Sequence, residues 1–184
     1  MNKALKFLND QLTAYLKINS GLNENMVTVG RIVEQDGTIP MKNRNKLVLS
    51  FVSLSQETSM RPNYSRMGFA ADGANIQQGA LNFTINVVLA SLFDEEQESL
   101  KFLSKAAEFF HNNLYFDKTE HPELPAEIAK INLEMCNLSL QEVDALWSGI
   151  GAKAVPSILY KVRVTSINTT SVDNDTPSIS SGQP

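Results

Sequence analysis

The sequence predicts an α+β fold: a single domain whose mixed, mainly antiparallel sheet of about five strands packs with about three helices. Two observations predict it. Segments with helical spacing of apolar residues are interleaved with segments of alternating spacing, a pattern that fits helices packed against one sheet. The chain has 184 residues, and its hydrophobic share of 42% lies in the ordinary globular range. One domain with a real core is therefore expected.

The N-terminal quarter predicts one helix and two strands. Apolar residues at helical spacing predict a helix over residues 2–19, and Gly21 follows where a helix C-terminus favours glycine. Alternation over residues 26–33 predicts a strand, which the turn residues of 36–40 end. Residues 46–54 are β-branched and aromatic on both faces, which predicts a strand covered from two sides.

The polar, glycine-broken stretch over residues 55–79 is unusually long for a connection inside a compact domain. Two interpretations stay open: a mobile surface excursion or poorly paired hairpin, and a contact loop. On the second interpretation, the candidate interface residues in this loop are Arg61, Tyr64 and Arg66.

A strand and the clearest helix follow. Residues 81–89 alternate and then become apolar on both faces, which predicts a strand that begins half exposed and ends in the core. Asp94 is expected to cap the next helix, whose acidic first turn suits the positive end of the helix dipole. Its expected buried face consists of Leu100, Leu103, Ala107 and Phe110.

A further strand is predicted over residues 131–136, again from alternation. Ser139 and Glu142 have the spacing of a capping box, which predicts a short helix that ends near Trp147, with Trp147 as its anchor. Gly149 and Gly151 are expected to let the chain reverse, and Pro156 to enter the last strand.

The last strand, "PSILYKVRV", has an apolar and a charged side. We expect Tyr160 to point inward, and Lys161 and Arg163 to face solvent or an acidic neighbour. Two placements stay open: a core strand that carries the tail outward, or an edge strand that meets another subunit. The interface candidates here are Trp147, Tyr160, Lys161 and Arg163.

Chemistry-bearing motifs are scarce. Sixteen basic against twenty acidic residues, with no basic cluster, disfavour nucleic acid as a partner. The lone Cys136, and His111 and His121, lack metal-ligand spacing, and a solvated surface role is expected for both histidines. The "SGIGA" stretch follows a helix rather than a strand and is no phosphate loop. We therefore predict no catalytic, cofactor-binding or metal-binding residues, no cofactor and no enzymatic activity.

The chain ends in a Ser, Thr and Asp-rich stretch without aromatic residues. Such a composition cannot bury enough surface to order itself, so we divide the chain into a domain over residues 1–167 and a flexible tail over residues 168–184. The N-terminus lacks the continuous apolar core of a signal peptide, and no segment is apolar enough to span a bilayer, which predicts assembly in the cytoplasm.

Five blocks carry a resemblance to a known family, in order over about residues 3 to 165: "LNDQLTAYLK", "DGTIP" with "NKLVLSFV", "SLKFLSKAAEFF", "LPAEIAKINLEMCNLSLQEVDALW" and "GAKAVPSILYKVRV". They resemble the N-terminal domain of the cap, or tail-terminator, family of phage-tail-like extracellular contractile injection systems. Two features depart from the family pattern, Ala154 after Lys153 and the long 55–79 loop, and these are consistent with a subtype such as a cap paralogue.

The resemblance implies a tail-terminator-like fold and a structural role. It implies a homo-hexameric ring that ends the inner tube and the sheath away from the baseplate, with the inner tube protein and the sheath protein as partners, in a particle that is released or membrane-attached. A competing interpretation is an adaptor paralogue that anchors the particle to a membrane or host structure through the loop or the tail.

Overall fold

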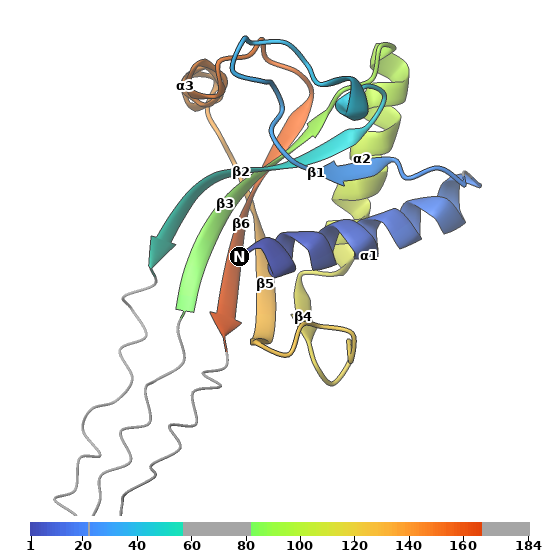
Figure 1. The fold of residues 1–184 in the computed structure, drawn as a ribbon, viewed down its shortest axis with the longest axis vertical. Coiled ribbons are helices and arrows are strands. Elements are labelled where there is room, and N and C mark those ends of the chain that lie inside the picture. Colours follow the sequence, from blue (N-terminus) through green and yellow to red (C-terminus); the bar gives the residue numbers. More distant parts are fainter. Residues whose placement is uncertain (22, 57–81, 167–184) are drawn as a thin grey trace, which may run out of the picture.

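The computed structural model describes residues 1–21, 23–56 and 82–166, and within these ranges it has three α-helices and six strands (Figure 1). In chain order the elements are α1 (Asn2–Ser20), β1 (Val27–Val29), the 3-10 helix η1 (Met41–Asn43), β2 (Leu47–Gln56), β3 (Asn82–Ser91), α2 (Glu96–Asn112), β4 (Tyr115–Asp117), β5 (Ile128–Cys136), α3 (Leu140–Ile150) and β6 (Ser157–Ser166). The predicted α+β class, with a mixed sheet and three helices, is confirmed.

The six strands form one sheet in the order β1-β2-β3-β6-β5-β4. β1 pairs parallel with β2, and every other pairing is antiparallel. The extra strand relative to the prediction is the three-residue β4, which is too short to show an alternating pattern. β6 lies between β3 and β5, so the core-strand interpretation holds and the edge-strand interpretation is wrong.

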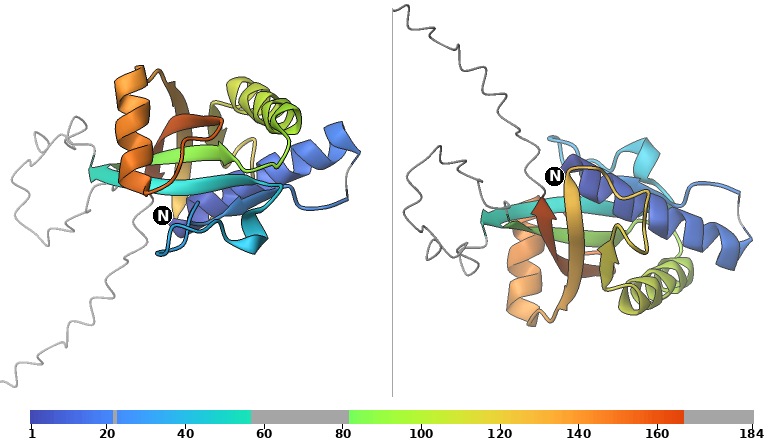
Figure 2. Two further views of the ribbon diagram at one scale, coloured as in Figure 1. Left: turned by 90° about the horizontal axis from the view of Figure 1, so that it is seen from above. Right: turned by 90° about the horizontal axis from the view of Figure 1, so that it is seen from below.

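The two faces of the sheet carry cores of different size. We call the side that packs against α1 and α2 the main face, and the side that packs against α3 the minor face. Figure 2 shows α1 and α3 on opposite sides of the sheet. The core of the main face joins both long helices to the strands through residues that include Leu8, Leu12, Phe102, Phe110, Ile85, Tyr160 and Val162.

The core of the minor face is small. Its buried residues are Ile32, Val48, Val88, Ala90, Leu92 and Trp147. Trp147 is the only fully buried residue of α3 and the centre of its contact with the sheet, to which the partly buried Val143, Leu146 and Ile150 add. The predicted capping box at Ser139 and Glu142 is present, and α3 ends at Gly151, whose φ of 76° is left-handed. Gly149, expected in the reversal, lies inside the helix instead.

Several local expectations fail because tertiary contacts decide them. The strand predicted over residues 26–33 is only β1, since the chain bonds to β2 no further than Gly30, whose N–H donates to the Leu49 carbonyl. The N-cap of α2 is Glu95, not Asp94, because the Glu95 carbonyl accepts the first helical hydrogen bond, from the Ser99 N–H, and Asp94 lies one residue earlier with its N–H bonded to the Asn45 side chain. Leu100 is exposed and Ala107 only partly buried, while the neighbouring turn positions Phe102, Ala106 and Phe109 face the core.

Candidate functional site

The charged side of β6 lies on the minor face beyond the reach of α3. Arg163 Nη2 lies 2.9 Å from Glu134 Oε2 on β5, and both side chains are about half exposed. The acidic neighbour expected for Arg163 therefore belongs to its own sheet. Such an exposed pair adds little to stability, about 0–1 kcal/mol, so its value lies in the surface it forms.

Polar side chains continue from this pair across four strands. Asn86 Nδ2 on β3 donates to Ser53 Oγ on β2 at 2.9 Å, and the strand registers bring the remaining members beside them. We call this surface the polar platform; it comprises Ser53, Ser55, Asn86, Asn132, Glu134, Lys161 and Arg163. It offers hydrogen-bond donors, acceptors and charge of both signs on rigid strands.

Two of the predicted interface residues are buried. Tyr160 is 2% exposed and its ring packs edge-on against Phe110, with centroids 5.1 Å apart, so its predicted inward direction is confirmed. Burial raises the pKa of its hydroxyl above the ordinary range, because the charged phenolate would lose its hydration. Trp147, also 2% exposed, is the anchor of α3 as expected. Neither ring offers surface to a partner, so any interface role of these two residues is indirect.

The other predicted interface residues divide into two groups. Lys161 and Arg163 belong to the polar platform, and their role in an interface stays a prediction. Arg61, Tyr64 and Arg66 lie outside the described residues, as do nearly all of the 55–79 loop and the tail over residues 168–184.

An open strand edge on β2 is a feature that sequence reasoning missed. β1 pairs only with Leu47 to Leu49, and no strand within the described ranges pairs with the outer side of β2 after that. Phe51 and Leu54 are about half exposed on this stretch, which corrects the expectation of a strand covered from two sides. Figure 1 shows the far half of β2 at the free side of the sheet. An uncovered edge of this kind readily pairs with another strand.

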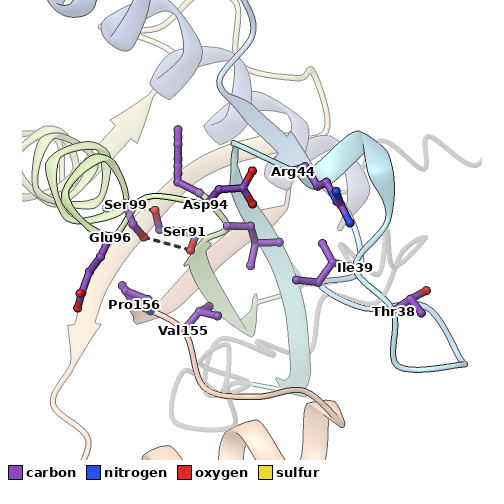
Figure 3. Close-up of a pocket in the computed structure, with 11 residues that line it drawn as sticks. Thr38, Ile39, Arg44, Ser91, Asp94, Glu96, Ser99, Val155 and Pro156 are labelled. Atoms are coloured by element: carbon purple, nitrogen blue, oxygen red, sulfur yellow. Dashed lines mark hydrogen bonds between the residues drawn. The ribbon is translucent and has the colours of Figure 1, made fainter.

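A cleft of about 610 Å³ lies where the start of α2 meets the loops before β2 and β6. Figure 3 shows Ser91 and Ser99 in its wall. The Ser91 hydroxyl donates to the Ser99 carbonyl at 2.9 Å, and the Ser99 hydroxyl to the Ser91 carbonyl at 3.3 Å. Both hydroxyls thus hold β3 to α2 and donate to backbone carbonyls rather than to a general base.

His121 and its acidic neighbour Glu123 take part in local structural contacts. The ring of His121 packs on those of Phe7 and Phe116, so the expectation of a solvated side chain is wrong for this residue. Its Nδ1 lies 3.1 Å from Glu123 Oε1; the pKa of Glu123 is lowered first by a hydrogen bond with its own backbone and then by this contact with His121. No cluster of three or more His, Cys, Asp or Glu side chains that could hold a metal occurs in the part of the chain that the structure describes.

The helices do not meet the requirements of a membrane span. Among residues 1–21, 23–56 and 82–166, none of them combines the length and the apolar character needed to cross a bilayer.

Comparison with solved structures supports the fold. The chain is similar to the sheath/tube terminator, in its extended state, of an extracellular contractile injection system called PVC, with a TM-score of 0.54, 17% identity, and coverage of 100% of this chain and 62% of the other. It is also similar to the tube-terminating cap of the anti-feeding prophage, with a TM-score of 0.55, 16% identity, and coverage of 96% and 58%. The chain therefore spans about three fifths of the length of these relatives.

Comparison of the sequence gives the family. No curated protein matches the chain. Over residues 5–181, however, the sequence matches the family model described as the Pvc16 N-terminal domain. This match covers every described strand and helix except the first residues of α1. The chain belongs to the Pvc16 N-terminal domain family.

Proposed function

We propose that this chain is a structural subunit that ends the tube and sheath of a phage-tail-like contractile injection particle. The observation that carries the proposal is the family match over residues 5–181. The two similar structures, a sheath/tube terminator and a tube-terminating cap, support it through their shared fold. The adaptor interpretation has no such support, and it rests on a loop and a tail that lie almost wholly outside the described residues.

In its finer form, the proposal is a homo-hexameric ring at the end away from the baseplate, assembled in the cytoplasm, with the inner tube protein and the sheath protein as partners. A terminator must bind the last ring of a polymer and offer no site for the next. Two different surfaces on one rigid sheet suit such one-sided binding, namely the polar platform on the minor face and the open β2 edge. A heterologous contact between copies closes into a ring when its rotation permits.

We propose that the chain works by binding alone. The Ser91 and Ser99 hydroxyls bond to backbone carbonyls, and His121 packs on two aromatic rings, so these groups are occupied by structural contacts. Residues that carry assembly rather than chemistry are expected on exposed strands, where the polar platform lies.

The decisive experiment is deletion of the gene followed by imaging of the particles. We expect tubes and sheaths of abnormal length, or none stable enough to isolate, and recovery of normal particles when the intact gene is returned. Images of normal particles should place the chain at the end opposite the baseplate and give its copy number. Normal particles from the deletion strain would contradict the proposal, and a monomer in both purified protein and particles would contradict the ring.

A further inference from the structure

Two rows of apolar side chains cross the main face from the β2 edge to the opposite edge. Strand register defines the first, which we call the tyrosine row: Phe51, Val87, Tyr160 and Met135. The second, the valine row, consists of Leu54, Ile85, Val162 and Leu133. Leu114 extends the valine row beyond β5, since the Leu133 N–H donates to the Leu114 carbonyl at 2.8 Å. Directly opposed residues share a face, so each row is one line of neighbouring side chains.

Both rows are buried in the middle and exposed at both ends. Val87, Tyr160, Ile85 and Val162 are 0–2% exposed. At the β2 edge, Phe51 is 47% and Leu54 50% exposed; at the opposite edge, Met135 is 43% and Leu114 46% exposed. A bulge between Phe51 and Ser53 places both β2 side chains on the main face although they are three residues apart. At both edges, exposed apolar side chains therefore lie on the main face, one at the end of the tyrosine row and one at the end of the valine row.

The backbone and the charges at these edges also favour pairing. β5 has no partner on its outer side beyond the short β4 in the described part of the chain, just as β2 has none beyond β1. Natural edge strands are commonly guarded by charge or proline, but β2 reads "LVLSFVSLSQ" and has neither. On the opposite edge, the charge next to Met135 is Glu134, which Arg163 of the same chain already pairs, and Asp117 at the end of β4 accepts hydrogen bonds from the Thr119 and Glu120 N–H groups. A neutral edge thus faces one whose nearest charge is compensated.

We propose that the open β2 edge of one copy meets the β4–β5 edge of a second copy, so that the tyrosine and valine rows continue from subunit to subunit. The two edges differ, so the contact is head to tail, and repeated contacts of this kind close a ring. A two-fold β2-to-β2 contact would stop at two copies and leave Met135 and Leu114 uncovered. The inference rests on the proposed ring and specifies which strand edges meet between its neighbouring copies.

The buried area shows how strong such a contact can be. An aromatic side chain buries about 150–250 Å², so the exposed half of Phe51 amounts to about 100 Å². Four such half-exposed side chains give about 350 Å², whereas stable interfaces bury about 1,200–2,000 Å² in total. The rows therefore form the apolar centre of the interface rather than its whole. Because each copy in a ring makes the contact twice, closure compensates for a weak single contact.

Thiol cross-linking tests the contact, with Cys136 first replaced by Ser to remove the native thiol. In this background Phe51→Cys and Met135→Cys place thiols at the two ends of the tyrosine row, which meet across the proposed interface. Purified chains and isolated particles are treated with a short thiol cross-linker. The matched control pairs Met135→Cys with Ile18→Cys, because Ile18 is 82% exposed at the far end of α1. We expect covalent dimers from a mixture of the two single variants, a ladder up to the closed ring from the double variant, and none from the control.

The outcomes separate the contact from the proposed function. Absence of cross-links in particles that hold the chain at their end would overturn the edge contact and leave the terminator role intact. Dimers from Phe51→Cys alone would show a two-fold contact and also overturn it. A ladder from purified chains, with the chain absent from particle ends, would support the contact and contradict the terminator role.

A charge variant gives a second readout that does not depend on cross-linking. Leu54→Lys places a charge at the centre of the proposed interface, and we expect it to weaken self-association about tenfold or more. Ile18→Lys is the matched control and should leave association unchanged. Circular dichroism checks that both variants are folded. Equal association of the two variants would overturn the proposal.

Discussion

The near and far halves of β2 differ although they belong to one strand. In β2, residues 47–50 are buried on both faces, between the helices of the main face and the α3 side, whereas residues 53–56 are exposed. The change comes at the bulge between Phe51 and Ser53. The near half of β2 contributes to both cores, and its far half extends beyond their cover. We therefore expect the exposed far half of β2 to meet a partner.

The largest expected effect is a break in the core of the main face, into which the near half of β2 packs. Phe110 is fully buried and packs edge-on against Tyr160 beneath the sheet. Phe110→Ala should lower the free energy of unfolding by about 3–5 kcal/mol, because it removes apolar contact and leaves a cavity. Urea denaturation followed by circular dichroism measures the loss.

The matched control for this variant is Phe51→Ala in the far half. Phe51 is half exposed, and surface substitutions usually change stability by no more than about 0.5 kcal/mol. A loss as large as that of Phe110→Ala would show that the far half of β2 is covered in the isolated chain, and would contradict the difference between the two halves.

Trp147 carries the second effect, since it is the only buried residue of α3. Trp147→Ala should lower the free energy of unfolding by about 3 kcal/mol, mainly because it releases α3 from the minor face. Hydrogen exchange should then be fast in α3 while α2, which packs in the other core, keeps its protection. Trp147→Phe, which keeps an aromatic ring, should lower the free energy of unfolding much less. Equal loss of protection in both helices would mean that the two cores unfold as one unit.

The cap of α3 gives a smaller effect. The Ser139 hydroxyl accepts from the Glu142 N–H at 3.3 Å and donates to the Glu142 carboxylate. Ser139→Ala removes both contacts and should lower the free energy of unfolding by about 1 kcal/mol, whereas Ser139→Thr, which keeps a hydroxyl that donates and accepts, should retain most of the cap. Thermal unfolding of the two variants compares them. If the alanine and threonine variants behave alike, the capping box does not contribute to the docking of α3.

The features that could be predicted from sequence are those with local causes. The first helix follows from its apolar spacing and Gly21, and the observed Asn2–Ser20 lies one residue from the predicted end. The capping box needs only Ser139 and Glu142 three residues apart. The two-sided character of β6 follows from alternation, which determines which side chains share a face.

The features that could not be predicted depend on contacts between distant segments. The central place of β6 follows from its pairing with β3 and β5, and no local pattern contains this. The Asp94 N–H donates to the side chain of Asn45, which is 49 residues away in the sequence, and α2 begins only after Glu95. The open β2 edge becomes visible only when the length of β1 is known. The polar platform was predicted in part, through Lys161 and Arg163, because these lie on one strand.

The smallest expected effect concerns pH and again distinguishes α3 from the rest of the fold. Hydrogen bonds from the Ser139 N–H, and then from its hydroxyl, hold the pKa of Glu142 below its ordinary value. A carboxylate with a lowered folded pKa stabilises the fold above its unfolded pKa, and this stabilisation disappears as pH falls through the folded pKa.

Acidification below the ordinary glutamate range should therefore loosen α3, which the emission of Trp147, the single tryptophan, reports. Asp36 and Asp117 also have lowered pKa values, through bonds from the Thr38 side chain and the Glu120 N–H, so acid weakens other parts in the same direction. Only the difference between the parent chain and Glu142→Gln isolates the cap, because glutamine does not titrate in this range. Identical acid profiles for the two chains would mean that the carboxylate adds nothing beyond the Ser139 cap.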